Sequence, residues 1–362
     1  MLRTGGAADN GTSVLVTDDV NGQNRSAVSA VRALAQAGFR PVVSTCGRYS
    51  VAAASRHCAG RVQLPAASED GYAAALHREL RNGDYLTALP ASDVALLALG
   101  TSGAKLVHKG VLADRAREAG LAVLPGRIYE SVNALRADAT TQSFPIVVKS
   151  AVKLGQDDVQ ARRVDSVEQV AQIPDAEGDV IVQPYVTDSL RAVTGVAWGG
   201  EFLALSHQRY LRLWPPGAGV GSAAVTVEPD RALEEPLLAL LSEHDGIFQA
   251  QFVGDYLLDV NPRVFGSLSL TVAAGANLPA IASDAARSRR GALVRGRVGV
   301  CYRWLEGDLR HLARARARGE ITTREALRRM VPRRGTAHSI ESVTDPLPSL
   351  LRIASAVHKR TE

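Results

Sequence analysis

Two neighbouring segments carry oxygen-bearing side chains in a pattern that could hold a metal ion. Apolar and polar residues alternate in Ile247–Val253 and Tyr256–Asn261, which predicts the two strands of a hairpin. The alternation places Asp259 and Asn261 on one face of the second strand, and Gln251 points from the first. One carboxylate with amide oxygens, water and phosphate is a ligand set that suits Mg²⁺. An ordinary hairpin with a polar outer face would show the same alternation.

The turn of this hairpin decides whether its polar side chains meet. In a regular hairpin, the numbers of two residues that face each other always add up to the same value, and their side chains lie on the same face. Gln251 and Asp259 can share a face only if this sum is even, but a plain two-residue turn at 254–255 gives an odd sum. We therefore predict a three-residue loop or a bulge there. Pro262 ends the second strand, and Arg263 brings a fixed cation beside the predicted metal position.

Lysine is rare in this chain, and its positions are informative. Only five of the 42 basic residues are lysine, and four of the five fall within Lys105–Lys153. Lysine is a mobile point charge, which suits phosphates that move during a reaction. Lys109 and Lys149 are therefore expected to bind phosphate. The alternative is that both side chains only reach solvent.

These motifs together resemble a known family. Asp259–Arg263 (DVNPR), with Gln251 before it, resembles the metal hairpin of the ATP-grasp superfamily, whose strand usually has the sequence Glu-x-Asn-Pro-Arg. The likeness is nearest to the carbamoyl-phosphate-synthetase-like branch and to the amino-acid ligases. Residues 144–149 (FPIVVK) are similar to the family's lysine strand, and residues 180–186 (VIVQPYV) resemble its adenine-binding hinge. The resemblance covers about residues 12–290.

The resemblance implies ATP and Mg²⁺ (or Mn²⁺) as cofactors and assigns roles to the matching positions. The loop after the lysine strand keeps one glycine, Gly155, so that Lys153 is expected to add charge beside the phosphates. The residues assigned to the nucleotide are Lys109, Lys149, Lys153, Gln183, Tyr185, Val186 and, for the ribose, Asp188. The residues assigned to the metal are Gln251, Asp259 and Asn261.

Further candidates for the reaction precede the hairpin. Arg209–Ser222 is rich in Pro and Gly and is predicted to be a loop. Arg209 and Arg212 could bind a carboxylate or phosphate in bidentate geometry, or they are surface arginines. His207 is either a general base or a strand-end histidine. With Arg263, which is expected to stabilise the transferred phosphoryl group, these residues are the catalytic candidates.

The elements that must position these residues indicate an α/β and α+β protein. Strands and helices alternate in the first hundred residues, which predicts a parallel, Rossmann-like sheet. The predicted strands there are Ser13–Thr17, Pro41–Ser44, Arg61–Leu64, Tyr85–Leu89 and Val94–Leu99. Lys105–Gly120 is a predicted helix and Leu121–Pro125 a predicted short strand.

Changes in composition and predicted elements divide the chain into four parts, which the resemblance implies are the parts of an ATP-grasp fold. These are a pre-ATP-grasp domain (1–104), a small lid subdomain (105–186), a large subdomain with the metal hairpin (187–290) and a helical C-terminal extension (291–362). The extension is rich in arginine, and it contributes to the net charge of +5.

Composition limits the partners and the location. The C-terminal arginines alternate with acidic residues and lack aromatic neighbours for stacking, so no nucleic acid is expected, and this face is either solvated or a contact in a homodimer. The longest apolar runs, such as Val94–Leu99, are far shorter than the ~20 residues that a membrane span needs. Without an apolar core of a signal peptide at the start, the expected location is the cytoplasm.

The function that the resemblance and the spacing imply is ATP-dependent joining of a small carboxylate to an amine, both expected to be amino-acid-like, through an acyl phosphate, with release of ADP and phosphate. Two alternatives remain from the sequence. One is carboxyphosphate or carbamoyl formation on the same fold, and the other is a nucleotide-binding regulatory protein with weak catalysis.

Overall fold

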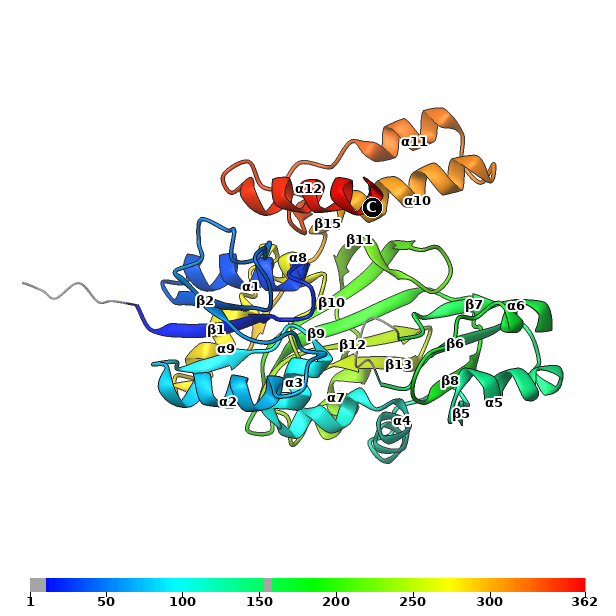
Figure 1. The fold of residues 1–362 in the computed structure, drawn as a ribbon, viewed down its shortest axis with the longest axis horizontal. Helices are drawn as coiled ribbons and strands as arrows, with labels where there is room; N and C mark the ends of the chain where they lie inside the picture. Colours follow the sequence, from blue (N-terminus) through cyan, green and yellow to red (C-terminus); the bar gives the residue numbers. More distant parts are fainter. Residues whose placement is uncertain (1–10, 153–157, 362) are drawn as a thin grey trace, which may run out of the picture.

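The chain begins with a parallel sheet. The computed structural model describes residues 11–152 and 158–361, and Figure 1 shows its elements in chain order. The first sheet, sheet A, has the strand order β3-β2-β1-β4 with every pair parallel, as predicted. Its strands are β1 (Ser13–Asp18), β2 (Arg40–Thr45), β3 (Gly60–Gln63) and β4 (Thr87–Leu89). The helices beside it are α1 (Arg25–Gln36), α2 (Tyr72–Asn82) and α3 (Asp93–Leu99).

The prediction of a strand over Val94–Leu99 is wrong, because this segment is helix α3. The Ser92 side chain accepts a hydrogen bond from the Ala95 amide and caps the start of the helix. Gly100 ends it in the left-handed conformation. A short apolar run is compatible with either element, and here the two caps decide for the helix.

The predicted helix over Lys105–Gly120 is divided into two pieces. A 3₁₀ segment, η1 (Ser102–Val107), precedes α4 (Lys109–Glu118). His108 separates them, since its ring accepts hydrogen bonds from the first amides of α4. The strand predicted over Leu121–Pro125 is wrong, and only a single bridge joins Val123 to Leu257.

A small antiparallel sheet follows. This sheet C has the order β5-β8-β6-β7. Its strands are β5 (Arg127–Tyr129), β6 (Ile146–Ser150), β7 (Arg162–Val164) and β8 (Val180–Pro184). Helices α5 (Val132–Ala137) and α6 (Val167–Ala171) pack on it and enclose a separate apolar core.

The large sheet B forms the centre of the molecule and has the order β13-β12-β9-β10-β11-β15-β16, with β14 beside β10. Its long strands are β9 (Leu190–Trp198), β10 (Glu201–Trp214), β11 (Val220–Val227), β12 (Gly246–Val253) and β13 (Tyr256–Asn261). Its short strands are β14 (Val294–Arg295), β15 (Cys301–Arg303) and β16 (Ala337–His338). The helices around it are α7 (Glu234–Leu240), α8 (Leu268–Ala273) and α9 (Leu278–Ala286).

The loop predicted over Arg209–Ser222 is wrong for most of its length. β10 continues to Trp214 and β11 starts at Val220, so that Arg212 pairs with Ala223. Both Pro residues and two of the three Gly residues that suggested a loop lie in the turn at 215–219, and Gly221 lies in β11. Pairing with β11 keeps the rest extended.

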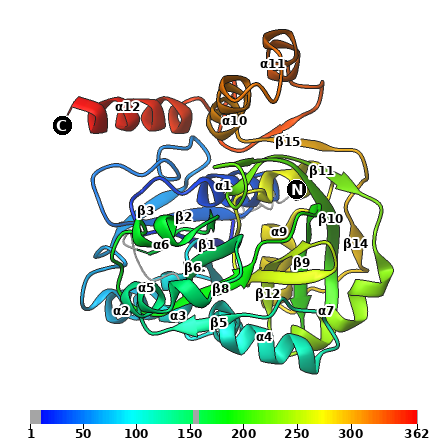
Figure 2. The ribbon, with the colours of Figure 1, turned by 90° about the vertical axis from the view of Figure 1, so that its right-hand side faces the viewer.

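Three C-terminal helices form a layer along one side of the molecule (Figures 1 and 2). They are α10 (Leu305–Ala317), α11 (Thr323–Met330) and α12 (Leu347–Thr361). The segment is not helical throughout, since β15 and β16 extend sheet B. In the described part of the chain, no helix has the length and apolar character needed to cross a membrane.

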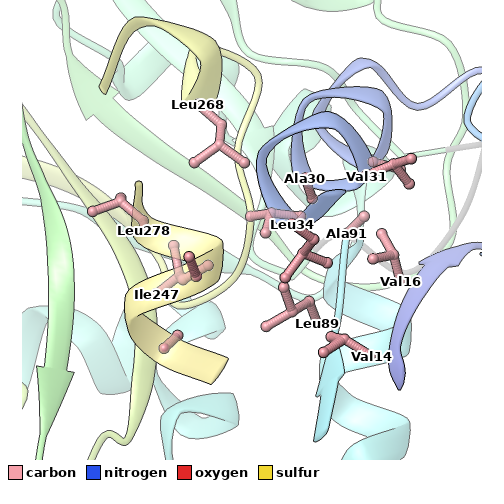
Figure 3. Packing of buried hydrophobic residues seen from close by; sticks show 14 of the residues in the cluster. Val14, Val16, Ala30, Val31, Leu34, Leu89, Ala91, Ile247, Leu268 and Leu278 are labelled. Carbon is pink, nitrogen blue, oxygen red and sulfur yellow. The ribbon is translucent and has the colours of Figure 1, made fainter. Parts of the chain in front are cut away.

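One apolar core joins sheet A to sheet B. Figure 3 shows α1 between strands β1 and β4 on one side and helices of sheet B on the other, with Leu34 facing Leu278 and Ile247. All three of these side chains are buried. Burial of this kind stabilises a fold by roughly 25 cal/mol per Å² of apolar surface, so that the two sheets are held as one unit.

Asp345, which is 1% exposed, anchors the C-terminal segment to α1 and to the loop that follows β2. Its carboxylate accepts hydrogen bonds from Arg32 Nε (2.8 Å), Ser55 Oγ (2.7 Å) and the Arg56 amide (2.9 Å). Burial alone raises the pKa of Asp345, but these hydrogen bonds and the Arg32 cation outweigh it and hold that pKa below its usual range.

We expect Asp345→Ala to lower the free energy of unfolding by about 3 kcal/mol, because it leaves buried donors without their partner. A depressed folded-state pKa stabilises the fold above the unfolded pKa, and this contribution is lost as pH falls. The difference from wild type, measured by urea denaturation, should therefore shrink below about pH 4. Asp114→Ala, at a mostly exposed carboxylate, is the control. A difference that stays constant down to pH 3 would contradict this account.

Candidate functional site

The hairpin of β12 and β13 has the predicted bulge. Its pairs near the turn are Val253 with Tyr256 and Phe252 with Leu257, and the register then shifts so that Gln251 pairs with Asp259. Leu258 is the extra residue. The prediction that Gln251 and Asp259 share one face is thereby confirmed. Asn261, paired with Gln249, lies on this face as well.

Two lysines that are far apart in sequence converge on the bulge. Lys149, at the end of β6, donates from Nζ to the Leu258 carbonyl oxygen over 3.1 Å. Lys109, the first residue of α4, forms a buried ion pair with Asp259. Lys109 is 5% exposed and Asp259 7%, so both charges are largely removed from solvent. The structure thus brings positive charge from two elements to consecutive residues of β13.

The amide side chains on the hairpin are held by Tyr210 of β10. Gln249 and Gln251 each donate from Nε2 to the Tyr210 hydroxyl oxygen, both over 3.1 Å. Burial raises the pKa of Tyr210 to about 12, so the hydroxyl keeps its proton over the working range of an enzyme. Because its Nε2 is bound in this way, Gln251 presents its carbonyl oxygen as the free end of the amide.

Arg263 is fixed from both sides. It forms an ion pair with Asp93 at the start of α3, and its Nη2 donates to the Asn261 side-chain oxygen over 3.0 Å. The Asn261 amide in turn donates to Gln249 over 3.2 Å. A chain of hydrogen bonds therefore runs from α3 into the hairpin of β12 and β13, and it orients the Asn261 side chain.

A cavity of about 680 Å³ lies between sheets B and C. On the sheet C side, its wall includes Gln183 and Lys149, and the hinge that follows β8 contributes Tyr185, Val186 and Asp188. Gln251 and Asp259 line it from the hairpin. Most of the residues predicted for a nucleotide and a metal therefore share one cavity. Lys153 lies outside the described residues.

Arg212 also lines the cavity, and one edge of its guanidinium is paired with a carboxylate. Its Nε and Nη2 bind the two carboxylate oxygens of Asp308 on α10, a residue with no exposed surface. Arg303 Nε lies 2.7 Å from the same carboxylate. One edge of the Arg212 guanidinium is thus held by α10, and the other edge, which carries Nη1, is turned away from Asp308.

The structure does not bring His207 and Arg209 to this cavity. Both alternate with Tyr210 along β10 and therefore point to the opposite face of sheet B. His207 is buried beside Glu234, with 3.6 Å between Nε2 and Oε1, and it accepts from the Asp230 amide. Burial lowers the pKa of His207. Arg209 is exposed.

The cavity residues that the sequence prediction missed include Tyr210, Trp304 and His311. Trp304, Asp308 and His311 follow one another at spacings of four and three residues at the start of a predicted helix, which places them on one helical face. This spacing was the available signal. The arginines around these residues indicate a solvent-exposed helix, and they obscure this buried face.

Comparison with known proteins identifies the fold. No family model and no curated protein matches the sequence. Among solved structures, an L-amino acid ligase from Bacillus licheniformis is 13% identical, with 77% of this chain and 75% of that chain covered and a TM-score of 0.55. N5-carboxyaminoimidazole synthetase from Staphylococcus aureus, complexed with ADP, is 12% identical, with 80% and 81% covered and a TM-score of 0.59.

The biotin carboxylase domain of 2-oxoglutarate carboxylase from Hydrogenobacter thermophilus, in complex with MgADP, ADP and bicarbonate, is 13% identical, with 80% and 73% covered and a TM-score of 0.57. These neighbours are ATP-grasp ligases, and the ATP-grasp fold predicted from the sequence is confirmed. At such identities the likeness concerns the fold.

We expect Tyr210→Phe to destabilise the fold by about 0.5–1.5 kcal/mol, because Gln251 Nε2 loses its acceptor and Gln249 Nε2 keeps only the Ser267 hydroxyl. Denaturant unfolding of the variant and wild type measures this difference. Tyr256→Phe, at the exposed tip of the hairpin, is the matched control and should leave the stability unchanged. Equal stability of Y210F and wild type would show that the hydroxyl does not hold the two glutamines.

Proposed function

We propose that this chain is an ATP-dependent ligase that joins a small carboxylate to an amine and releases ADP and phosphate. The observation that carries the proposal is the convergence of Lys109 and Lys149 on the bulge of the metal hairpin. Placing two lysines beside one carboxylate and two amide side chains is suited to binding a triphosphate with its metal ion.

The nucleotide would lie in the cavity between sheets B and C. Gln183, Tyr185 and Val186 border its hinge side, where an adenine ring would rest against Val147 and Leu258. Asp188, on the same rim, would bind the ribose hydroxyls. Lys149 stands two residues beyond Val147 on the same face of β6, which is the direction in which the phosphates would extend.

The residues present fit Mg²⁺ that arrives with the nucleotide. The hairpin offers one carboxylate, Asp259, and the amide oxygens of Gln251 and Asn261. No group of three His, Cys, Asp or Glu side chains forms a metal cage anywhere in the described part of the chain. Mg²⁺ commonly takes its remaining ligands from water and substrate phosphates, as this ligand set requires. The metal would neutralise the charge that develops on the phosphate oxygens.

The chain's own residues would then support transfer of the γ-phosphoryl group. An oxygen of the carboxylate substrate attacks phosphorus, the bond from phosphorus to the bridging oxygen breaks, and ADP leaves with the electron pair. Lys149 and Lys109 would offset the phosphate charge, and Arg263, held by Asp93, would face the product acyl phosphate as a fixed cation. Attack by an amine on the acyl carbon expels phosphate and forms the amide.

Carboxyphosphate formation is the second candidate, because two of the solved structures with this fold are a carboxyaminoimidazole synthetase and a biotin carboxylase domain. It differs from the first in its carboxylate, which would be bicarbonate. ADP release that requires bicarbonate, and not an organic carboxylate, would favour this second candidate. ATP binding without turnover would favour a regulatory protein.

We expect Lys149→Ala and Asp259→Asn each to reduce kcat for ADP release by about 10²–10³-fold, because each removes charge stabilisation at the phosphoryl group. A coupled assay of ADP release, run with pairs of amino acids and small carboxylates, measures the loss. Lys105→Ala, which removes an exposed lysine next to Glu243, is the control. If both variants turn over as fast as wild type, the ligase assignment is wrong.

A further inference from the structure

The side of the cavity across sheet B from the metal hairpin is built by the C-terminal segment. β13 is at one edge of the sheet, whereas α10 directly follows β15 near the other edge. Trp304 and His311 reach the cavity from α10, and Tyr210 and Arg212 reach it from β10. Because the nucleotide-binding residues lie on the hairpin, the hinge and sheet C, this α10 side remains for a second substrate.

His311 has a defined tautomer at this wall. Its Nδ1 lies 2.8 Å from the carbonyl oxygen of Leu213, and a carbonyl oxygen can only accept, so Nδ1 carries the proton. Nε2 of the neutral ring is then a proton acceptor. The charged groups around this face of α10 include Arg25 on α1, which lies over the Trp304 ring, and Arg212, Asp308 and Arg303, which bind one another.

Trp304 supplies a hydrogen-bond donor without a partner. The side chain is 8% exposed and lines the cavity, and its Nε1–H has no acceptor among the described residues. Gly307 packs against the Cε3–Cζ3 edge of the indole, the edge opposite Nε1, and leaves no room there for a Cβ. The Arg25 guanidinium lies 3.7 Å above the ring centroid and fixes the plane. A buried donor that is held rigidly and left unpaired is costly unless a ligand accepts from it.

We propose that the α10 side of the cavity binds the amine substrate as an amino acid. His311 Nε2 takes the proton from its attacking nitrogen, and Trp304 Nε1–H binds its carboxylate. This inference rests on the proposed function and adds the class of the amine and the residues that receive it. Arg212 also lines the cavity, and since it shares the one carboxylate of Asp308 with Arg303, this group keeps the net positive charge that a carboxylate requires.

The step balances as a simple acyl transfer. The ammonium group gives one proton to His311 Nε2, and the nitrogen lone pair then forms the bond to the acyl carbon. The bond between that carbon and the phosphate oxygen breaks, and phosphate leaves with the electron pair. The second proton on nitrogen passes to the departing phosphate. His311 returns its proton to solvent after release.

Hydroxylamine separates this role from a structural one. It is small, carries no carboxylate and is largely unprotonated at neutral pH, so it attacks an acyl phosphate without a general base and gives a hydroxamate. Wild type is first tested with each of the twenty amino acids as carboxylate, and hydroxylamine or a second amino acid as amine, with ADP release and product mass as readouts.

We expect His311→Asn to reduce ligation of the amino-acid amine by about 10²–10⁴-fold, while hydroxamate formation stays close to the wild-type rate. The lost rate should recover partly as pH rises, because more of the amine is then unprotonated. Trp304→Phe should raise KM for the amino-acid amine about tenfold and leave KM for ATP and for hydroxylamine unchanged. His77→Asn on the exposed face of α2 and Trp198→Phe are the matched controls.

Each result has one meaning. If wild type releases no ADP with hydroxylamine and any organic carboxylate, the proposed function fails. If wild type forms hydroxamates but joins no amino-acid amine, the substrate class proposed for the α10 side is wrong. If H311N loses hydroxamate formation as well, or keeps both reactions, His311 is not the base.

Discussion

The extra residue at Leu258 is the constraint on which the site depends. A hairpin with a regular two-residue turn would pair Gln251 with Leu258 and turn Asp259 to the other face. The bulge restores Asp259 to the face of Gln251 and, at the same point, exposes the Leu258 carbonyl to Lys149 on sheet C. A single extra residue therefore both places Gln251 and Asp259 on one face and joins the two sheets that enclose the cavity.

The buried ion pair of Lys109 and Asp259 explains how the hairpin can hold a carboxylate that is largely removed from solvent. Two charges of opposite sign, each less than a tenth exposed, are tolerated because each offsets the desolvation of the other. Phosphates and a cation would offer the two groups new partners of matching charge, Lys109 taking phosphate and Asp259 the metal. The ion pair therefore holds the side chains of Lys109 and Asp259 in place on the hairpin. The same two groups are those that the reaction would use.

Sequence reasoning was most successful where the relevant constraint is local. The parity of paired residue numbers predicted the bulge, and the alternation in β12 and β13 placed Gln251 and Asp259 correctly on one face. It failed where two signals of similar strength compete. The apolar run at Val94–Leu99 suits a strand or a helix, and only the caps at Ser92 and Gly100 decide between them. Pro and Gly in a five-residue turn likewise concealed the strands on either side of it.

The α10 side of the cavity could not be predicted from local patterns because its parts lie far apart in the chain. Tyr210 and Arg212 precede Trp304 and His311 by about a hundred residues, and the pairing of β11 with β15 brings them together. Asp308 is the link, since one carboxylate without exposed surface binds arginines from β10 and β15. A buried carboxylate between two guanidinium groups fixes α10 against the sheet, and this fixes the direction of Trp304 and His311. The C-terminal arginine that matters to the cavity is therefore the buried Arg303, which holds the helix in place together with Arg212 of β10.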